Sequence, residues 1–215
     1  VDWRIQDDDR FAGKDWLSDA ALSGDLETVV QAFSGGYDWD INDRTSGEQG
    51  TVLLNAVRGS HAHTRCVEVV EWLLAHGADP DAGYDSTCKT CPLHLTGDSP
   101  ERLRIATMLL EAGADVNARR GLTSEERARA SLLGGPNAGG QTVLHCAAHY
   151  GHVSYIRLML KWGADIHARM GVDHLSVLQK AATPDWTSTP HRWEACRALL
   201  EDVLRAGSWK AYVLA

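Results

Sequence analysis

The sequence predicts an all-α solenoid in which short helix pairs repeat along the chain and stack on one another. Three observations support this fold class. A Gly-Ala-Asp triplet ends three leucine-rich helical segments, at residues 77–79, 113–115 and 163–165. A shorter apolar segment and a turn precede each of these segments, so the same unit returns several times. Helices of this length are marginal in isolation, and they need neighbouring units to bury their apolar faces.

The most regular unit is GGQTVLHCAAHYGHVSYIRLMLKWGADIHARMG, residues 139–171. Its pattern predicts a turn, a short helix over TVLHCAAHYG, a reversal at Gly151 and His152, and a second helix over VSYIRLMLKWG. We expect the second helix to end at Gly163, because glycine readily adopts the left-handed backbone conformation that closes many helices.

Other copies of this unit are visible on both sides of it. We expect an acidic leader over residues 1–14 and a repeat domain over 15–215, with repeats at 15–48, 49–82, 87–121, 138–171 and 173–207 and then a C-terminal tail. The first and last copies match the pattern least well. That is expected where one face of a repeat meets water instead of another repeat.

These strings resemble the ankyrin repeat, whose pattern is T-P-L-H-x-A-A-x-x-G-H followed by I-V-x-x-L-L-x-x-G-A-D-V-N. The resemblance covers about nine-tenths of the chain, and it implies an all-α ankyrin solenoid of about five helix-turn-helix repeats with irregular insertions. The insertions are at residues 61–65, 122–139 and 183–192. The second of them contains SEERARASLL, which predicts an extra helical turn after a serine cap.

The resemblance also implies roles for individual residues. In the family, the threonine and histidine of T-P-L-H tie the turn to the first helix and to the next repeat. Thr142, His145 and His94 take these roles here, whereas Leu54 and Gln179 replace the histidine and should leave looser junctions. The family pattern places small residues where helices approach closely and leucines in the shared core; these are Ala56, Ala147 and Ala181, and Leu73, Leu74, Leu109, Leu110, Leu158 and Leu160.

Composition excludes several classes of function. The net charge of −8 and the isoelectric point near 5.6 argue against nucleic-acid binding, which depends on Lys and Arg neutralising phosphates, and against an anionic membrane surface. No apolar run is long enough to predict insertion into a membrane, and no apolar signal segment opens the chain. The five cysteines form no dense framework, so we expect a reducing compartment, the cytoplasm.

The stretch CKTCPLHLT, residues 88–96, allows more than one interpretation. Cys88 and Cys91 could join His61 and His63 in a zinc site between two repeats, because zinc takes four thiolate or imidazole ligands. A redox pair or disulfide between the two cysteines is a third possibility. Aligned with the repeat, however, Cys91 takes the threonine position and His94 the histidine position. We therefore favour a structural role for these residues and expect no metal and no cofactor.

The sequence carries no nucleophile elbow, phosphate-binding loop or H-E-x-x-H motif, so we favour a non-enzymatic protein. Ankyrin stacks present a concave surface made of turn tips and the exposed side of each first helix. By position in the repeat, the partner-binding residues are Glu48, Arg58, Thr90, Asp98, Gln141, His149 and Tyr150, with Trp186 in the insertion beyond them.

We therefore predict a protein-recognition module (an adaptor, scaffold or inhibitor) that binds another protein through this groove and the inserted loops. The alternative is that the insertions close the groove into a pocket for a small molecule or a catalysed reaction. An enzyme would need several titratable groups that converge in such a pocket.

Aromatic residues are numerous at the ends of the chain. Trp3, Trp16 and Trp39 are expected to cluster and seal the outer face of the first repeat, while Trp72 and Trp162 should pack in the core. The apolar tail SWKAYVLA either folds back over the last repeat through Trp209, Tyr212 and Leu214 or meets a partner; we favour folding back, because exposed apolar patches are rare.

Overall fold

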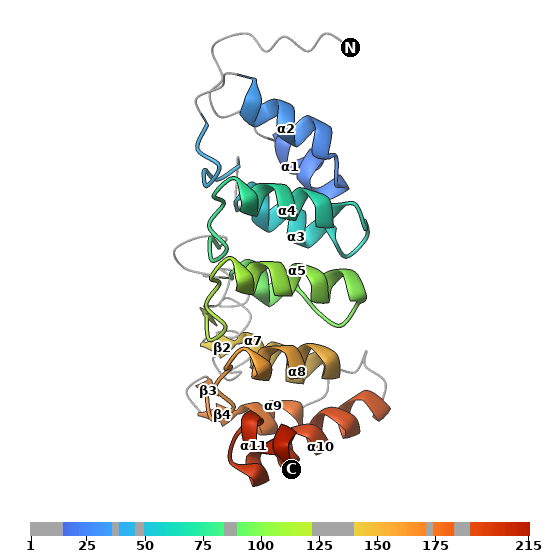
Figure 1. Cartoon of the computed structure of the whole chain (residues 1–215), viewed down its shortest axis with the longest axis vertical. Helices are drawn as coiled ribbons and strands as arrows, with labels where there is room; N and C mark the ends of the chain where they lie inside the picture. The colour runs from blue at the N-terminus through green and yellow to red at the C-terminus, as the bar shows by residue number, and fades with distance from the viewer. Residues whose placement is uncertain are drawn as a thin grey trace, which may run out of the picture.

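The computed structural model describes residues 15–35, 39–45, 50–83, 90–121, 140–170, 174–182 and 190–215. Helix pairs succeed one another along a single axis, with the N-terminal pair at one end and the C-terminal pair at the other (Figure 1). This arrangement confirms the predicted all-α solenoid. Glu48, Cys88, Trp186, Trp3 and the expected extra helix over SEERARASLL lie outside the described residues.

The helices form two layers. The first helices of successive repeats contact one another in one layer, made of α1 (Asp15–Ser23), α3 (Val52–Gly59), the 3₁₀ helix η1 (Pro92–Leu95), α7 (Val143–Tyr150) and α9 (Val177–Ala181). The second helices form the other layer, made of α2 (Leu26–Ser34), α4 (Cys66–Ala75), α5 (Pro100–Glu111), α8 (Val153–Lys161) and α10 (Pro190–Ala206). The repeat boundaries inferred from the sequence stay a prediction.

Short antiparallel strand pairs mark one edge of the stack, which we call the hairpin edge. The strand β1 (Arg119–Arg120) pairs with β2 (Gln141–Thr142), and β3 (Arg169–Met170) pairs with β4 (Leu175–Ser176). The opposite edge, where each first helix turns into the second, is called the turn edge below. Figure 1 shows the labelled strands together on one side of the helix layers.

The core fills the space between the two layers. Ala56, Ala147 and Ala181 are buried, as the repeat pattern predicts, and they allow neighbouring first helices to approach closely. Leu73 and Leu109 are fully buried from the second-helix side. Each repeat thus contributes half of an interface that only its neighbour completes, which is why the units are stable as a stack.

The second helices end as the sequence predicts. At the end of α8, Gly163 has φ 89° and its amide donates to the Leu160 carbonyl at 3.1 Å. The Ala164 amide donates to the Met159 carbonyl at 3.0 Å, which completes a Schellman motif. The helix therefore stops at a fixed residue, and the chain turns into the hairpin edge.

The loop that follows each second helix is tied to the neighbouring repeat. The side chain of Asn42 accepts a 2.7 Å hydrogen bond from the Asp79 amide and donates to the Gly77 carbonyl at 3.3 Å. Asn117 makes the same pair of bonds to Asp165 and Gly163. Along the hairpin edge, an asparagine side chain of one repeat therefore binds the Gly-Ala-Asp turn of the next repeat and fixes the position of one repeat on the other.

The third repeat differs from the helix pair that the sequence predicts. Its first helix is reduced to the four residues of η1. Ser99 is extended, at φ −72° and ψ 152°, because the following Pro100 disfavours a helical conformation for the residue before it. Ser99 then caps α5 by accepting a 3.3 Å hydrogen bond from the Arg102 amide. The stretch Thr96–Ser99 consequently crosses directly to the second layer.

Two expectations, for Leu214 and Trp162, need correction. The tail forms α11 (Trp209–Leu214), and Trp209 and Tyr212 pack on the core as predicted, but Leu214 is 78% exposed because it lies on the outer side of this last helix. Trp162 was expected in the core and is 39% exposed instead, because it follows the last turn of α8. Trp16 and Trp39 do pack together, with ring centroids 5.8 Å apart.

Candidate functional site

Four of the expected partner-binding residues lie at the turn edge. Arg58 is in the last turn of α3, Asp98 connects η1 to α5, and His149 and Tyr150 end α7. The structure adds further polar and aromatic residues from four repeats to these four. We call the whole set the turn-edge cluster; it consists of Arg58, His61, Asp98, Arg102, His149, Tyr150, His152, Arg192 and Trp193.

Two other expected residues lie elsewhere and are buried. Thr90 is 4% exposed and Gln141 is 8% exposed, both near the hairpin edge. Gln141 is covered because its strand pairs with Arg120, and its side-chain oxygen accepts a hydrogen bond from the Cys146 thiol at 3.4 Å. The expectation that Thr90 and Gln141 present their side chains to a partner is therefore wrong.

The aromatic part of the cluster surrounds Tyr150, which is 47% exposed. The centroid of its ring is 5.0 Å from that of His149 and 5.8 Å from that of His152. His149 in turn meets the buried ring of Trp193 edge-on at 6.4 Å. Gly151, at φ 70°, reverses the chain between Tyr150 and His152. Tyr150 is therefore held on a fixed support, with half of its surface open to solvent.

The polar part of the cluster is organised by His61, in the inserted loop after α3. Its Nε2 donates to the Leu95 carbonyl at 2.9 Å, and its Nδ1 accepts a hydrogen bond from the guanidinium of Arg102. Burial, followed by the positive charge of Arg102, lowers the pKa of His61. His61 is thus a neutral bridge between repeats.

Burial also lowers the pKa of His152, against the opposing effect of the Asp98 carboxylate. His61 and His152 are then neutral, while Arg58, Arg102 and Arg192 each bring a positive charge to the cluster. Asp98 has a structural role as well, because its Oδ1 accepts a 2.8 Å hydrogen bond from the Tyr155 amide in the first turn of α8. This bond joins the third repeat to the fourth.

Sequence reasoning assigned His61 only to a zinc alternative and missed Arg102, Arg192 and Trp193. Their side chains come together only once the repeats are stacked. The sequence contains one signal for this site, the insertion at residues 61–65 with its two histidines. A loop inserted between the two helices of a repeat lies at one edge of the stack.

The structure argues against the zinc alternative for the residues that it describes. Cys91 is buried at the start of η1, and its sulfur lies 3.1 Å from His94 Nδ1. Both ring nitrogens of His61 are engaged at the other end of η1, by the Leu95 carbonyl and by Arg102. Burial raises the pKa of Cys91 to about 12, which disfavours a thiolate ligand. Within the described ranges, no group of three or more His, Cys, Asp or Glu side chains could hold a metal ion.

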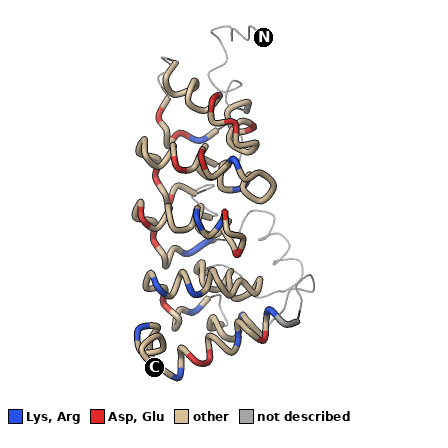
Figure 2. Tube along the Cα trace, turned by 45° about the vertical axis from the view of Figure 1, so that its right-hand side comes forward, with Lys and Arg blue, Asp and Glu red and all other residues tan. Residues whose placement is uncertain are grey.

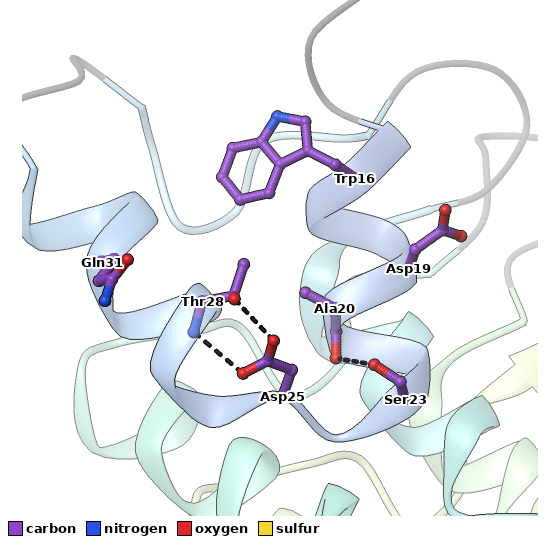
Figure 3. Close-up of a pocket in the computed structure, with 7 residues that line it drawn as sticks. All are labelled: Trp16, Asp19, Ala20, Ser23, Asp25, Thr28 and Gln31. Atoms are coloured by element: carbon purple, nitrogen blue, oxygen red, sulfur yellow. Dashed lines mark hydrogen bonds between the residues drawn. The ribbon is translucent and has the colours of Figure 1, made fainter. Parts of the chain in front are cut away.

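A separate hollow of about 570 Å³ lies on the first repeat, on the side of α1 and α2 turned away from the second repeat (Figure 3). Trp16 and Ala20 line it from α1, and Thr28 and Gln31 line it from α2. Asp25 caps α2, because its carboxylate accepts 3.2 Å and 2.6 Å hydrogen bonds from the Thr28 amide and hydroxyl. These bonds lower the pKa of Asp25, so this carboxylate acts as a helix cap.

Among the described residues, α1, α2 and the turn between them line this hollow, and none of these lining residues belongs to the insertions. It therefore does not correspond to the pocket that the alternative hypothesis requires. In the described part of the chain, no helix is both long and apolar enough to cross a membrane.

Comparison with known proteins agrees with this architecture. A family model described as "Ankyrin repeats (3 copies)" matches residues 17–120, and one described as "Ankyrin repeat" matches residues 139–170. Human ankyrin repeat and SOCS box protein 6 is 34% identical over 101 residues, as is the protein of the same name from Pongo abelii. These matches cover 47% of this chain and 21% of each relative, so the chain spans about a fifth of their length.

The repeat units, the stacked helix pairs and these matches agree with one another over more than half of the sequence. The chain belongs to the ankyrin repeat family.

Proposed function

We propose that the chain is a non-enzymatic recognition module that binds a partner protein through the turn-edge cluster. Ankyrin repeats in general are protein-interaction modules, and this coarser function is shared by the family. The observation that carries the finer proposal is the half-exposed ring of Tyr150, which packs against His152. Arg102 and Arg192 lie close enough to His152 to lower its pKa. Tyrosine and arginine are enriched among the residues that dominate binding energy in protein interfaces.

The support beneath Tyr150 favours tight binding. Its ring is already held between His149 and His152, and it follows a helix that the stack fixes in place. A side chain that is ordered before binding loses less conformational entropy when a partner covers it. The hydrogen bond between the charged Arg102 and the neutral His61 orders the neighbouring polar groups in the same way.

Among the adaptor, scaffold and inhibitor roles, we favour an adaptor, because the names of the relatives pair ankyrin repeats with a second module, the SOCS box. The acidic net charge supports a protein partner over a nucleic acid. We also propose a cytoplasmic location; the buried free thiols of Cys66, Cys91, Cys146 and Cys196 are compatible with a reducing compartment.

The test is affinity capture from cell extract on three immobilised proteins: the wild type, R58A/Y150A and the control W162A. Trp162 is the matched control because it is an exposed aromatic residue remote from the turn edge. We expect a partner that the wild type and W162A retain equally and that R58A/Y150A binds about 30-fold more weakly, as for the loss of an interface hot spot. Circular dichroism melts verify that all three are folded. Retention of the same proteins on all three would overturn the proposal.

A further inference from the structure

A groove of about 420 Å³ lies on the outer side of the second-helix layer, between α5 and α8. Its apolar floor is formed by Leu103 of α5, Leu158 of α8 and Trp209 of α11. Its rim carries Arg104, Arg157 and Lys161. The turn-edge cluster contributes none of these residues, so the groove is a second and separate surface.

The groove exists because α5 and α8 meet through their inner faces only. Ile105 and Leu109 of α5, and Ile156 and Met159 of α8, are buried between the layers. On the outer side, Ser154 is too small to fill the space between the two helices. The hydroxyl of Thr107 is occupied by a 2.8 Å hydrogen bond to the Leu103 carbonyl, so this side chain adds its methyl group to the apolar floor.

The charges on the rim are unbalanced. Arg104 pairs with Glu71 of α4 at 3.0 Å, and on α10 Arg197 pairs with Glu201 at 2.8 Å. By contrast, Arg157 and Lys161 have no ion-pair partner among the described residues, and α8 carries Lys and Arg but no Asp or Glu (Figure 2). These two residues are four apart on one helix, so they lie on the same side of it.

A basic rim on a chain of net charge −8 is a local exception, and its charge is complementary to a ligand that carries carboxylates. We propose that this groove binds an acidic peptide segment of a partner protein that carries an aliphatic or aromatic side chain. The apolar side chain lies on Leu103, Leu158 and Trp209. Carboxylates on either side of it pair with Arg157 and Lys161 through charge-assisted hydrogen bonds.

The two parts of the groove have different effects on binding. Burial of the apolar side chain supplies most of the affinity, whereas the charges steer the segment and set its orientation. A peptide fits these observations better than a nucleic acid, because three cations neutralise few phosphates and the rest of the chain repels a polyanion.

The first experiment is selection from a random 12-residue peptide library, displayed on phage, against the immobilised wild-type chain. We expect enriched peptides in which Asp or Glu flank Leu, Ile, Phe or Trp. Their affinities are then measured by fluorescence polarisation on R157E/K161E, on W209A and on the control R197E/R205E. The control changes the net charge by the same amount on α10, where both arginines are in exposed ion pairs that contribute little to stability.

We expect R157E/K161E to weaken binding at least about tenfold and the control to change it less than about twofold. W209A should weaken binding at low and high salt alike, whereas the effect of R157E/K161E should shrink as salt rises. If a charge reversal prevents folding, R157Q/K161Q replaces it, with a smaller loss in the same direction. R58A/Y150A should bind these peptides as the wild type does, which separates this inference from the function proposed above.

Three results would each overturn the inference: no enriched peptide, enriched peptides without carboxylates, and unchanged binding on both the charge-reversed and the neutralised variant. Competition of a twelve-nucleotide oligo-dT with the selected peptides would also overturn it, because it would assign the rim to phosphate.

Discussion

The phenol of Tyr155 donates a 2.7 Å hydrogen bond to the carbonyl oxygen of Leu93, across 62 positions of the sequence. Leu93 lies in η1, where the Thr96 amide reaches this carbonyl only at a long 3.4 Å. The neighbouring carbonyl of Leu95 receives the 2.9 Å bond from His61 of the preceding repeat. Side chains from the repeats on both sides therefore replace the turns of helix that the third repeat lacks.

The first prediction follows from that bond. Y155F removes the hydroxyl and keeps the ring in the core, so we expect a loss of about 1 kcal/mol in the free energy of unfolding, measured by urea titration. The loss stays moderate because Thr96 Oγ1 also donates to the Leu93 carbonyl, at 2.9 Å. Y212F is the control, since it removes the hydroxyl of a half-buried tyrosine in the last helix. Equal losses in the two variants would contradict the bridging role of Tyr155.

Much of the architecture could be predicted from the sequence, and the exceptions have local causes. The helix pairs and their buried alanines follow from a periodic pattern, which short-range signals such as Gly163 reinforce. In the third repeat the helix already ends at Thr96, which is extended at ψ 179°. Pro100 then keeps Ser99 extended, so no helix resumes before α5 despite the resemblance of CPLHLT to a first helix. The repeat pattern predicts a helix there because it compares residue types along the chain and does not include the backbone conformation of Thr96 and Ser99.

The candidate site was less predictable because it is assembled across repeats. Position in the repeat predicted Tyr150 and Arg58 for a concave groove, whereas the structure has them at the turn edge. The same reasoning placed Gln141 on the surface, because it did not include the strand pairing that covers this residue. The bond from His61 to Leu95 joins residues 34 positions apart. It depends on how an insertion packs against the next repeat, which no local pattern encodes.

The second prediction is that D81N stabilises the protein. Asp81 stands where Asn42 and Asn117 stand in other repeats, and its oxygens accept from the Asp115 amide at 2.9 Å and 3.2 Å. A carboxylate has no hydrogen to donate to a Gly-Ala-Asp turn, whereas Asn42 and Asn117 each donate to a glycine carbonyl. We expect the asparagine to add up to about 1 kcal/mol at pH 7.5.

The pH dependence of this gain provides its control. Burial, followed by the nearby Asp115 and Asp79 carboxylates, raises the pKa of Asp81 above its ordinary value of 3.8. The folded state therefore favours the protonated form of the Asp81 carboxyl. The stability that this carboxyl contributes is lost as the pH rises through its folded pKa. The advantage of D81N in urea titrations should thus shrink as pH falls from 7.5 to 4.5. An advantage that grows toward acid would contradict this account.

The third prediction concerns acid sensitivity. In the folded protein, burial lowers the pKa values of His94 and His145 to about 4, from an ordinary value of 6.5. Both rings bridge repeats: their Nε2 atoms donate to the carbonyls of Gln141 and Leu175, each at 3.3 Å. The stability that comes from a lowered histidine pKa is fully present above pH 6.5 and is lost as the pH falls toward 4. In that range the unfolded chain binds a proton at each of these rings and the folded chain does not.

H94Q/H145Q should therefore lose less stability than the wild type between pH 7 and pH 5, measured by urea titration. Glutamine suits the position, because Gln179 already accepts a 2.9 Å hydrogen bond from the Ser176 amide in the fifth repeat. At pH 7.5 the variant should be about 1–2 kcal/mol less stable, since the two bridging bonds are altered. H63Q, at an exposed histidine, is the control. Parallel pH curves for wild type and double variant would refute the prediction.

The fourth prediction tests the closest approach between the first two repeats. Gly59 ends α3 against the backbone of the preceding repeat, and a Cβ there would overlap the Leu22 carbonyl oxygen and lie 2.8 Å from the Cys66 sulfur. Replacing a helical glycine by alanine ordinarily stabilises by about 0.5–1 kcal/mol. We expect the opposite sign for G59A, a loss of about 2–3 kcal/mol, because the clash pushes α3 away from α1.

G97A is the matched control for this clash. A Cβ at Gly97 would meet the guanidinium of Arg102 at 3.1 Å and the imidazole of His152 at 3.2 Å, and both are ends of side chains that can shift. G97A should therefore change the free energy of unfolding by less than about 1 kcal/mol. Thermal melts that place G59A level with G97A would show that the spacing of α1 and α3 adjusts freely. A lower melting temperature for G59A alone would show that the Leu22 backbone limits this approach.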